Sequence, residues 1–459
     1  MIGQRLFLLL QVSIFFLILI FLPAGFLSAQ QTDQENTSRK TALIRFAGKR
    51  NAVWEAEKRK ADSIAGLMAY PIAYSEDDSR IIILQRLGRN GKPVYYATDN
   101  ISSAATIYVD QVWPDTNAYP SLSGEGVEIN LWDGGTVRIT HKEFQGESDS
   151  RVIMRETDLP LSNHSTHITG TMIASGFDSD ARGMSGGAKV KGWDLNSDIA
   201  EMAGAAADGI ILSNHSYGPL CGWDYRETNE SWYWYGDPDI SESEDYKFGF
   251  YDQVSADLDF IAFNAPYYLI VKSAGNDRND SPTSSYAHFV WDGIWQLVNV
   301  EREPDGGLDG YDCLNSMAVA KNILTVGAVD DTGSMTAFSA YGPTDDGRIK
   351  PDVVANGYNV YSSTAASDHD YGSYNGTSMA SASATGALAL LHQLQSIVRP
   401  GVPLLAATLK AILIHTALEA GNSTGPDYEF GWGLMNIKDA ADLISRNSEN
   451  GGKNIYEDV

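Results

Sequence analysis

Five short apolar segments, each bounded by glycine or polar residues, alternate with helix-like stretches from Gly126 onward. The segments are GVEINLWDGG, GIILSNHS, YYLIVKSAGN, NILTVGAV and DVVANG, and the stretches between them include IAEMAGAAA and VSADLDFIAF. Strands that alternate with helices predict βαβ units and a largely parallel sheet. The fold class expected for this part of the chain is therefore α/β.

The chain begins with a long apolar run that follows one cation, Arg5, and ends at the small residues Ser28 and Ala29. This pattern predicts a secretory signal peptide over residues 1–29. An uncleaved anchor helix is the alternative, because the run approaches the ~20 residues that span a bilayer. No later segment is apolar for as long, so we expect a secreted or extracytoplasmic product with no membrane contact after signal removal.

A small α+β module is expected between the signal peptide and the main domain, over residues 30–104. Residues 30–40 are polar and favour a flexible leader, ALIRFA favours a strand, and AVWEAEKRKADSIAGLM approximates helical spacing with Asn51 as its cap. The segments RIIILQRL and PVYYAT flank Asn90-Gly91, a strong hairpin signal.

Net charge limits the binding partners that fit this chain, and the cysteine content limits its disulfides. The formal net charge of −26 disfavours nucleic acid, whose binding depends on cationic contacts to phosphate. An acidic surface favours solubility and cation binding instead. Cys221 and Cys313 are an even number in an oxidising compartment, so either one disulfide or two buried thiols fit the sequence.

Polar residues mark the places where the predicted strands end. In open parallel sheets, sites lie beyond the carboxyl ends of the strands, and Asp133, Ser216 and Asn276 follow three of the apolar segments. Taken alone, Asp133 before two glycines is equally a turn residue, and Asn276 is equally a turn cap.

Two further segments carry groups that could do chemistry. Ser378 opens a helix rich in small residues, where it is either a cap or a nucleophile placed near unpaired N–H groups. His164 and His167 lie three residues apart in NHSTHITG. The zinc pattern HExxH is absent, so a general base is the better interpretation for one histidine and a packing role for the other.

In combination, these residues resemble the subtilisin-like serine peptidases (subtilases). The resemblance is carried by the order Asp133, His164, Asn276, Ser378, by NHSTHITGT and NGTSMASASATG around the reactive residues, and by SNHSYG and RIKPDVVANG. It covers roughly residues 105 to 445. The resemblance implies a three-layer sandwich around a largely parallel sheet, and hydrolysis of polypeptides through an acyl-enzyme.

The resemblance also implies a role for each residue. Ser378 would be the nucleophile, His164 the general base, and Asp133 the carboxylate that orients it, with Asn276 as oxyanion donor. Ser216, Tyr217 and Gly218 would bind substrate by strand addition. No cofactor is required for such catalysis, structural calcium is common in the family, and we expect a monomer.

The sequence departs from the family pattern beside two of these residues. HSTHITG stands where the family has HGTHVAG, which places Ser165 next to His164, and Asp133-Gly134-Gly135 stands for D-[ST]-G. Neither change removes a catalytic group, and both affect fine geometry and substrate preference.

The remaining predictions concern the edges of the catalytic domain, which we place at residues 105–446 with a flexible tail at 447–459. Residues 221–251 are dense in aromatics and acids, and form either a self-packing surface loop or a rim of the cleft. In the second case Asp237, Asp239 and Glu242 are candidate calcium ligands. The module at 30–104 is either a removable pro-segment or a permanent extension.

Two other classes of function fit parts of the sequence. An α/β-hydrolase esterase also uses Ser, His and an acid, but that class places the serine first in the chain, whereas Ser378 comes last here. A surface-binding protein without activity would keep the fold and use the aromatic insertion to hold its ligand.

Overall fold

The computed structural model describes residues 24–68, 71–76, 80–88, 91–98, 104–114, 121–156, 159–282 and 286–457. Its centre is a seven-stranded sheet in the order β15-β14-β11-β7-β4-β6-β5, in which every pair of neighbours is parallel. The strands are β4 (Glu128–Trp132), β5 (Val152–Met154), β6 (Lys189–Trp193), β7 (Leu212–His215), β11 (Leu269–Ser273), β14 (Leu324–Val329) and β15 (Val353–Asn356). The predicted parallel sheet is confirmed, and its strands β7, β11 and β14 are buried along their whole length because both faces of the sheet are covered.

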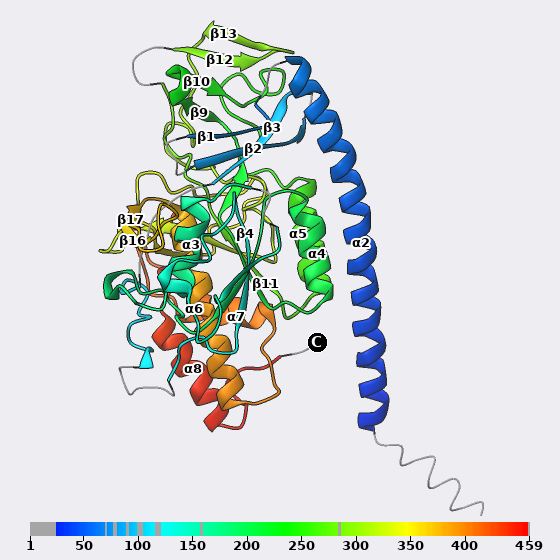
Figure 1. Cartoon of the computed structure of the whole chain (residues 1–459), viewed down its shortest axis with the longest axis vertical. Helices are drawn as coiled ribbons and strands as arrows, with labels where there is room; N and C mark the ends of the chain where they lie inside the picture. Colours follow the sequence, from blue (N-terminus) through cyan, green and yellow to red (C-terminus); the bar gives the residue numbers. More distant parts are fainter. Residues whose placement is uncertain are drawn as a thin grey trace, which may run out of the picture.

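Helices cover both faces of this sheet (Figure 1). The cluster on one face includes side chains of α3 (Asn163–Ile173), α6 (Thr377–Val398), α7 (Ala406–Thr416) and α8 (Ile437–Glu449). The other face is covered by α4 (Asp198–Ala207) and α5 (Gln253–Asn264). The small residues of α6 allow the close packing that the sequence predicts. A hairpin of β16 (Val360–Ser363) and β17 (Tyr371–Tyr374) lies beside α3.

A single long helix, α2 (Ala24–Met68), replaces three of the elements expected near the N-terminus. The predictions of a flexible leader at 30–40, a strand at 42–47 and a cap at Asn51 are wrong. The helix continues because it packs along α4 and α5 (Figure 1): Leu43 is buried there, and Phe46 stacks on Phe260 with ring centroids 4.5 Å apart. Tertiary contact therefore overrides the local polar pattern.

The signal-peptide prediction falls mostly outside the described residues, which begin at Ala24, and its last six residues form the start of α2. None of the helices within the described ranges combines the length and apolarity needed to cross a bilayer.

The N-terminal module continues with three antiparallel strands, β1 (Ala73–Glu76), β2 (Arg80–Leu87) and β3 (Pro93–Thr98). The predicted hairpin of β2 and β3 is confirmed, although Asn90 of its turn lies outside the described residues. A fourth strand from the main domain, β8 (Tyr217–Pro219), completes the sheet by pairing antiparallel with β3. The module is thus joined to the main domain through a shared sheet.

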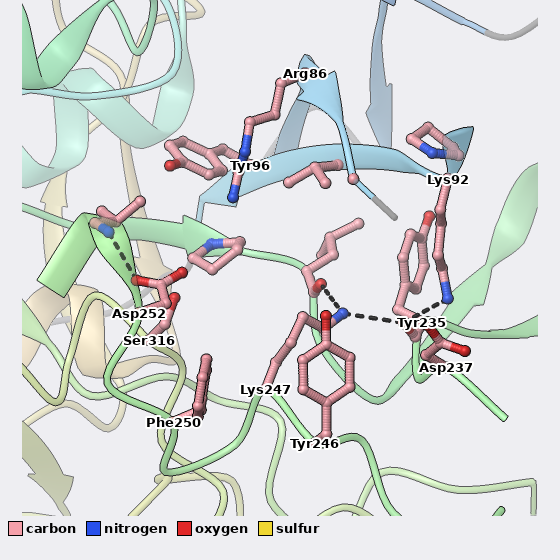
Figure 2. Close-up of a pocket in the computed structure, with 16 residues that line it drawn as sticks. Arg86, Lys92, Tyr96, Tyr235, Asp237, Tyr246, Lys247, Phe250, Asp252 and Ser316 are labelled. Atoms are coloured by element: carbon pink, nitrogen blue, oxygen red, sulfur yellow. Dashed lines mark hydrogen bonds between the residues drawn. The ribbon is translucent and has the colours of Figure 1, made fainter. Parts of the chain in front are cut away.

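The aromatic insertion is a folded sheet and not a loop. Its strands β9 (Trp223–Arg226) and β10 (Ser231–Trp234) join β12 (Ala287–Trp291) and β13 (Trp295–Asn299), which come from a later part of the chain. A pocket lies beside β3 and β8 (Figure 2), and Lys92, Tyr235 and Lys247 line it. Cys221 and Cys313 are free thiols in one buried cluster beside the sheet.

The segment after Ile444 is ordered, so the predicted flexible tail at 447–459 is wrong for its described part. Helix α8 reaches Glu449, and Asn447 is buried. The Asn447 side-chain oxygen accepts hydrogen bonds from the backbone N–H groups of Asn454 and Ile455, both at 2.9 Å. These bonds hold the polar tail against the domain, which the composition of the tail does not reveal.

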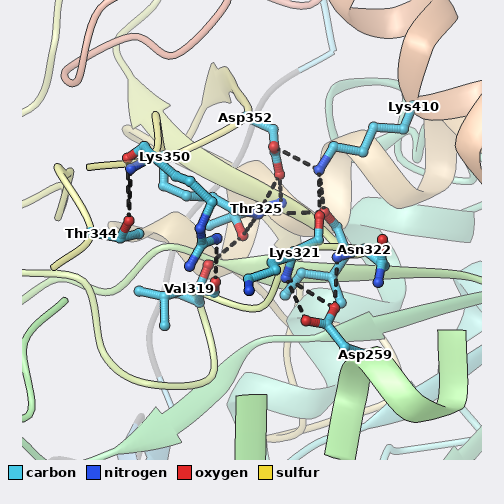
Figure 3. Close-up of polar contacts among 12 residues, drawn as sticks. Asp259, Val319, Lys321, Asn322, Thr325, Thr344, Lys350, Asp352 and Lys410 are labelled. Carbon is cyan, nitrogen blue, oxygen red and sulfur yellow. Dashed lines mark hydrogen bonds and ion pairs between the residues drawn. The ribbon is translucent and has the colours of Figure 1, made fainter. Parts of the chain in front are cut away.

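A buried ion cluster joins β14, β15 and α7 (Figure 3). The Asp352 carboxylate accepts from Lys350 Nζ and Lys410 Nζ, each at 2.7 Å, and from the backbone N–H of Thr325 at 2.8 Å. The two ammonium groups hold the pKa of Asp352 below its usual range, while burial lowers the pKa of Lys350 to about 7. This cluster fixes the edge of the sheet from which the chain leads to α6.

Candidate active site

Asp133 lies just beyond the end of β4 and is fully buried. One carboxylate oxygen, Oδ1, accepts from the backbone N–H of Gly134 at 2.7 Å and from the hydroxyl of Ser165 at 2.9 Å. The next residue, Gly135, has a φ of 107°, a conformation that residues with a Cβ rarely adopt. The glycine pair therefore lets the chain turn sharply while the carboxylate stays hydrogen-bonded.

His164 reaches the same carboxylate oxygen from the first turn of α3. The distance from its Nδ1 to Asp133 Oδ1 is 2.7 Å, and the histidine is fully buried. Its other ring nitrogen, Nε2, is buried without a hydrogen-bond partner. A histidine whose Nδ1 donates to a carboxylate keeps Nε2 as the free basic nitrogen.

His167, the second histidine of the motif, has a packing role. Its Nε2 lies 3.1 Å from the carbonyl of Val360, and its ring stacks on Tyr374 with centroids 4.7 Å apart. Complete burial lowers the pKa of His167 to about 3, so the ring stays neutral. Of the two histidines, His164 therefore contacts a carboxylate, and His167 packs against the β16–β17 hairpin.

Ser378 is the second residue of α6 and is also fully buried. Its hydroxyl donates to the carbonyl oxygen of Ser216 at 3.0 Å, and not to His164. The hydroxyl of Ser216 in turn donates to the carbonyl of Ser378 at 3.0 Å. In this structure Asp133 therefore contacts His164, while Ser378 contacts Ser216. The hydroxyl of Ser378 is not hydrogen-bonded to His164.

Asn276 is fixed by Thr377, the residue before the candidate nucleophile. The Asn276 side-chain oxygen accepts from the Thr377 backbone N–H at 2.9 Å and from its hydroxyl at 3.0 Å. The Thr377 hydroxyl also accepts from the N–H of Gly275 at 3.1 Å. Because the oxygen of the Asn276 amide faces Thr377, its NH₂ group points away from that residue and is available as a donor.

Ser216 and Tyr217 do not present their side chains to a cleft, and Gly218 has none. Ser216 and Tyr217 are fully buried, and the Tyr217 hydroxyl donates to Asp198 at 2.8 Å. The backbone of this segment pairs instead with β3, in the register Thr98 with Tyr217 and Ala97 with Gly218. The strand expected to receive a peptide by strand addition is occupied by the chain's own N-terminal module.

The calcium candidates are not brought together. Asp239 and Glu242 are exposed, and the Asp237 carboxylate accepts from the backbone N–H of Asp239 within its own turn. Across the described ranges, no group of three or more His, Cys, Asp or Glu side chains is arranged to hold a metal ion. These residues therefore do not fit a calcium site.

Two contributors to the site were not assigned a role from the sequence. Ser165 was noted as a departure from the family, but its hydrogen bond to Asp133 is a product of the fold, because 32 positions separate the two residues. Thr377 holds the Asn276 side chain, and the sequence indicates this residue only through its position directly before the candidate nucleophile.

Comparisons with known proteins identify the class. The profile of the subtilase family matches residues 121–433, and the chain belongs to this family of serine-type peptidases.

Two relatives show how much of the chain is matched. Subtilisin-like protease 2 of Pseudogymnoascus destructans is 25% identical over 344 residues, which cover 74% of this chain and 68% of that protein. An uncharacterised protein of Aquifex aeolicus is 34% identical over 121 residues, or 22% of this chain and 54% of that one. The chain therefore spans about half of one relative and two thirds of the other.

A solved structure supports the fold. The CspB protease of Clostridium perfringens superimposes with a TM-score of 0.54 at 16% identity, covering 74% of this chain and 98% of that structure. At this level of identity the likeness concerns the fold alone.

Proposed function

We propose that this subtilase is a serine endopeptidase that cleaves polypeptides through an acyl-enzyme on Ser378. The observation that carries the proposal is the 2.7 Å contact between His164 Nδ1 and Asp133 Oδ1, which leaves Nε2 as the only basic nitrogen of the ring. Asp133 orients His164 and stabilises its cationic form, and His164 acts as general base.

Ser378 would become reactive when its hydroxyl turns from Ser216 toward His164. In the resting arrangement the hydroxyl donates to the Ser216 carbonyl, and His164 Nε2 has no partner. Catalytic hydrogen bonds often form only in the substrate complex. His164 would then take the proton as the Ser378 oxygen attacks the scissile carbonyl, and would return it to the leaving amine.

The negative charge of the tetrahedral intermediate needs donors near the start of α6. The Asn276 NH₂ group and the backbone N–H of Ser378 are the candidates, because Thr377 holds the Asn276 oxygen on the opposite side. Donors fixed in advance act without reorganisation at the moment of reaction.

The test compares Ser378→Ala with Ser383→Ala. Ser383 lies on the same helix, and its buried hydroxyl has no hydrogen-bond partner, so the second variant is the control. We expect Ser378→Ala to abolish fluorophosphonate labelling and reduce hydrolysis of a mixed peptide library to near background. Ser383→Ala should keep both. Labelling that persists in Ser378→Ala would contradict the proposal. A parent chain that is not labelled even after the N-terminal module is removed would also contradict it, and would favour a binding protein.

The N-terminal module, residues 30–104, is proposed to act as a pro-segment that covers the cleft. The supporting observation is that β3 occupies the edge of Tyr217–Pro219. Ala97→Pro removes an amide hydrogen from β3, and losing a ladder bond of ~1 kcal/mol or more should raise the initial rate on a short peptide at least ~5-fold. Ala97→Ser, which keeps the N–H, is the control. Equal rates for the two variants would argue against a covering role.

We further propose that the protein is secreted or extracytoplasmic and acts as a monomer. The supporting feature is the signal-peptide pattern over residues 1–29. N-terminal sequencing of the exported protein should find a start near residue 30, or beyond Thr98 if the module is removed. A protein that retains residue 1 and stays in the membrane fraction would support the anchor alternative.

A further inference from the structure

A cavity of about 160 Å³ lies between the N-terminal module and the first residues of α4 and α5. The module contributes side chains of α2, β2 and β3 to this junction cavity, and the main domain contributes the start of each helix. None of the candidate catalytic residues, which are all described, lines it. The polar and aromatic side chains of its lining include Arg50, Trp54, Gln85, Arg86, Tyr96 and Asp198.

A β-bulge turns two successive residues of β2 toward the junction cavity. In a regular strand, neighbouring side chains point to opposite faces of the sheet, yet Gln85 and Arg86 both line the cavity. The register with β3 explains this, because Gln85 is the extra residue of an irregular step between Leu84 and Arg86. Bulges re-aim side chains in this way, and they are frequent beside functional sites. Figure 2 shows Arg86 extending from β2 toward the main domain.

Gln85 presents an unpaired hydrogen-bond donor to the cavity. The residue is 4% exposed, and its Oε1 accepts from the indole N–H of Trp54 at 3.4 Å. Because an indole nitrogen can only donate, Trp54 fixes the amide with its oxygen on the Trp54 side. The amide nitrogen Nε2 is buried and has no partner among the described residues. Buried donors are nearly always satisfied in folded proteins, so this one indicates an acceptor that enters the cavity.

Further groups make the cavity favourable for an anion. The Nε of Arg50 is also buried without a hydrogen-bond partner, although the Nη2 of the same guanidinium pairs with Asp257 at 3.0 Å. Helix α4 begins at the cavity with Asp198, and its N-cap residue Ser197 makes no side-chain bond to the helix because its hydroxyl donates to Asn51. The N-terminus of a helix carries a partial positive charge that attracts anions.

The acidic side chains of the lining already have donors or face solvent. One Asp198 oxygen accepts from the backbone N–H of Ile199 at 2.7 Å, and the other accepts from the Tyr217 hydroxyl at 2.8 Å. Glu57, the other acid of the lining, is exposed. Neither carboxylate is bonded to Gln85. The buried donors of the cavity therefore exceed the acceptors that the described residues offer them.

We propose that the junction cavity binds a small carboxylate whose apolar body is about the size of one aromatic ring. The carboxylate accepts from Gln85 Nε2, from Arg50 Nε and from the Arg86 guanidinium, whose planar N–H groups match a carboxylate. The ring packs against Trp54 and Tyr96, and an apolar cavity of ~150 Å³ is known to hold benzene. Because both parts of the chain form the walls, the bound molecule stabilises their contact.

The experiment titrates phenylacetate into the full chain carrying Ser378→Ala, with isothermal calorimetry at neutral pH as the readout. We expect a Kd of ~1 mM or tighter, and a Tm that rises with phenylacetate concentration. Because this variant lacks the Ser378 hydroxyl, peptide hydrolysis plays no part, and the result is independent of the proposed peptidase activity. Phenylacetate that does not bind would overturn the proposal.

Three related probes test the chemical class of the ligand. Phenylacetamide keeps the shape without the charge, acetate keeps the charge without the ring, and phenethylamine carries a cation in place of the carboxylate. Each should bind at least ~10-fold more weakly than phenylacetate, because each lacks either the charge-assisted hydrogen bonds or the buried ring. Phenylacetamide or phenethylamine that binds as tightly as phenylacetate would contradict a carboxylate site.

Variants assign the binding to the junction cavity. Gln85→Glu keeps the oxygen that faces Trp54 but replaces the donor with a negative charge, and should weaken phenylacetate binding ~10- to 100-fold. Arg86→Met keeps the apolar stem and removes the guanidinium, with an expected loss of ~10-fold or more. Arg59→Met is the matched control, since this side chain of α2 is 71% exposed, and should change the Kd less than ~2-fold.

The variants also locate any binding that is found. Equal affinity of phenylacetate for Gln85→Glu and Arg59→Met would place the ligand elsewhere, and the assignment of the cavity would be wrong. Thermal unfolding of each variant without ligand identifies a failure to fold. If Gln85→Glu does not fold, Arg86→Met decides, because Arg86 is only partly buried. An unchanged Kd for Arg86→Met would then refute the proposal.

Discussion

Ser165 donates a hydroxyl hydrogen bond to Asp133, the candidate catalytic aspartate. The family pattern has a hydroxyl residue at a different position. Three donors converge on Asp133 Oδ1: the N–H of Gly134 and His164 Nδ1 at 2.7 Å, and the hydroxyl of Ser165 at 2.9 Å. In the family pattern D-[ST]-G, the hydroxyl belongs to the residue after the aspartate, which is Gly134 here. We therefore expect the two departures to compensate each other.

Ser165→Ala should lower kcat/KM for a peptide substrate by ~10- to 100-fold. A hydrogen bond to a charged group contributes about 1.5–3 kcal/mol, and 1.4 kcal/mol corresponds to a factor of ten. Burial of Asp133 and Ser165 keeps water from replacing the lost donor. Alanine is preferred to glycine because it does not add flexibility to α3.

The double variant Ser165→Ala with Gly134→Ser is the rescue. Gly134 is not among the positive-φ residues, so a serine can adopt its backbone conformation. We expect recovery of most of the lost kcat/KM, with thermal unfolding measured in parallel to separate activity from stability. A single variant as active as the parent, or a double variant no better than the single one, would refute the reasoning.

Two further predictions concern buried charges. Asp352→Asn leaves Lys350 and Lys410 without their counter-ion, so we expect the free energy of unfolding to fall by ~3–5 kcal/mol and the Tm by ~3–6 °C in calorimetry. The loss should be smaller when Lys350→Met is added, and a shift below ~1 °C for Asp352→Asn alone would contradict the role of the cluster. The second concerns Lys92, whose pKa in the folded chain is lowered to about 7 by burial and then by Lys247, against the opposing effect of Asp245 and Asp237. Folding therefore favours the neutral amine, so the free energy of unfolding should fall as the pH drops from about 10 toward 7, and this contribution should change little below pH 7. Denaturant unfolding at pH 9 and pH 7 checks this sign, and a pH dependence as large in Lys92→Met as in the parent chain would contradict it.

The central fold could be predicted because its signals are local. Strands such as LIVKS and LTVGAV are mostly apolar, and each lies between helix-like stretches, so the parallel sheet follows from nearby residues. The candidate site follows from the same pattern, since Asp133 and Asn276 stand where strands end. The contact between His164 and Asp133 was expected from the family resemblance and is present at 2.7 Å.

The long helix of the N-terminal module could not be predicted in the same way, because its contacts are distant in sequence. Nothing in residues 30–50 indicates the buried groove along α4 and α5 that stabilises them as helix. The aromatic insertion likewise pairs with a strand more than fifty residues later, as in the register of Tyr233 with Phe289. Long-range pairing leaves no periodic signal in either segment alone.

The sequence by itself determined the sheet, the order of the reactive residues and the family, because hydrophobic periodicity and short motifs depend only on neighbouring positions. Only the tertiary structure decided which partners these elements take. It placed β3 on the strand expected to bind substrate, Ser165 on Asp133, and the hydroxyl of Ser378 on Ser216 instead of His164. The physical reason is that a strand edge, a hydroxyl or a buried carbonyl can hydrogen-bond many groups. The group that it binds is the one that chain packing brings within hydrogen-bonding distance.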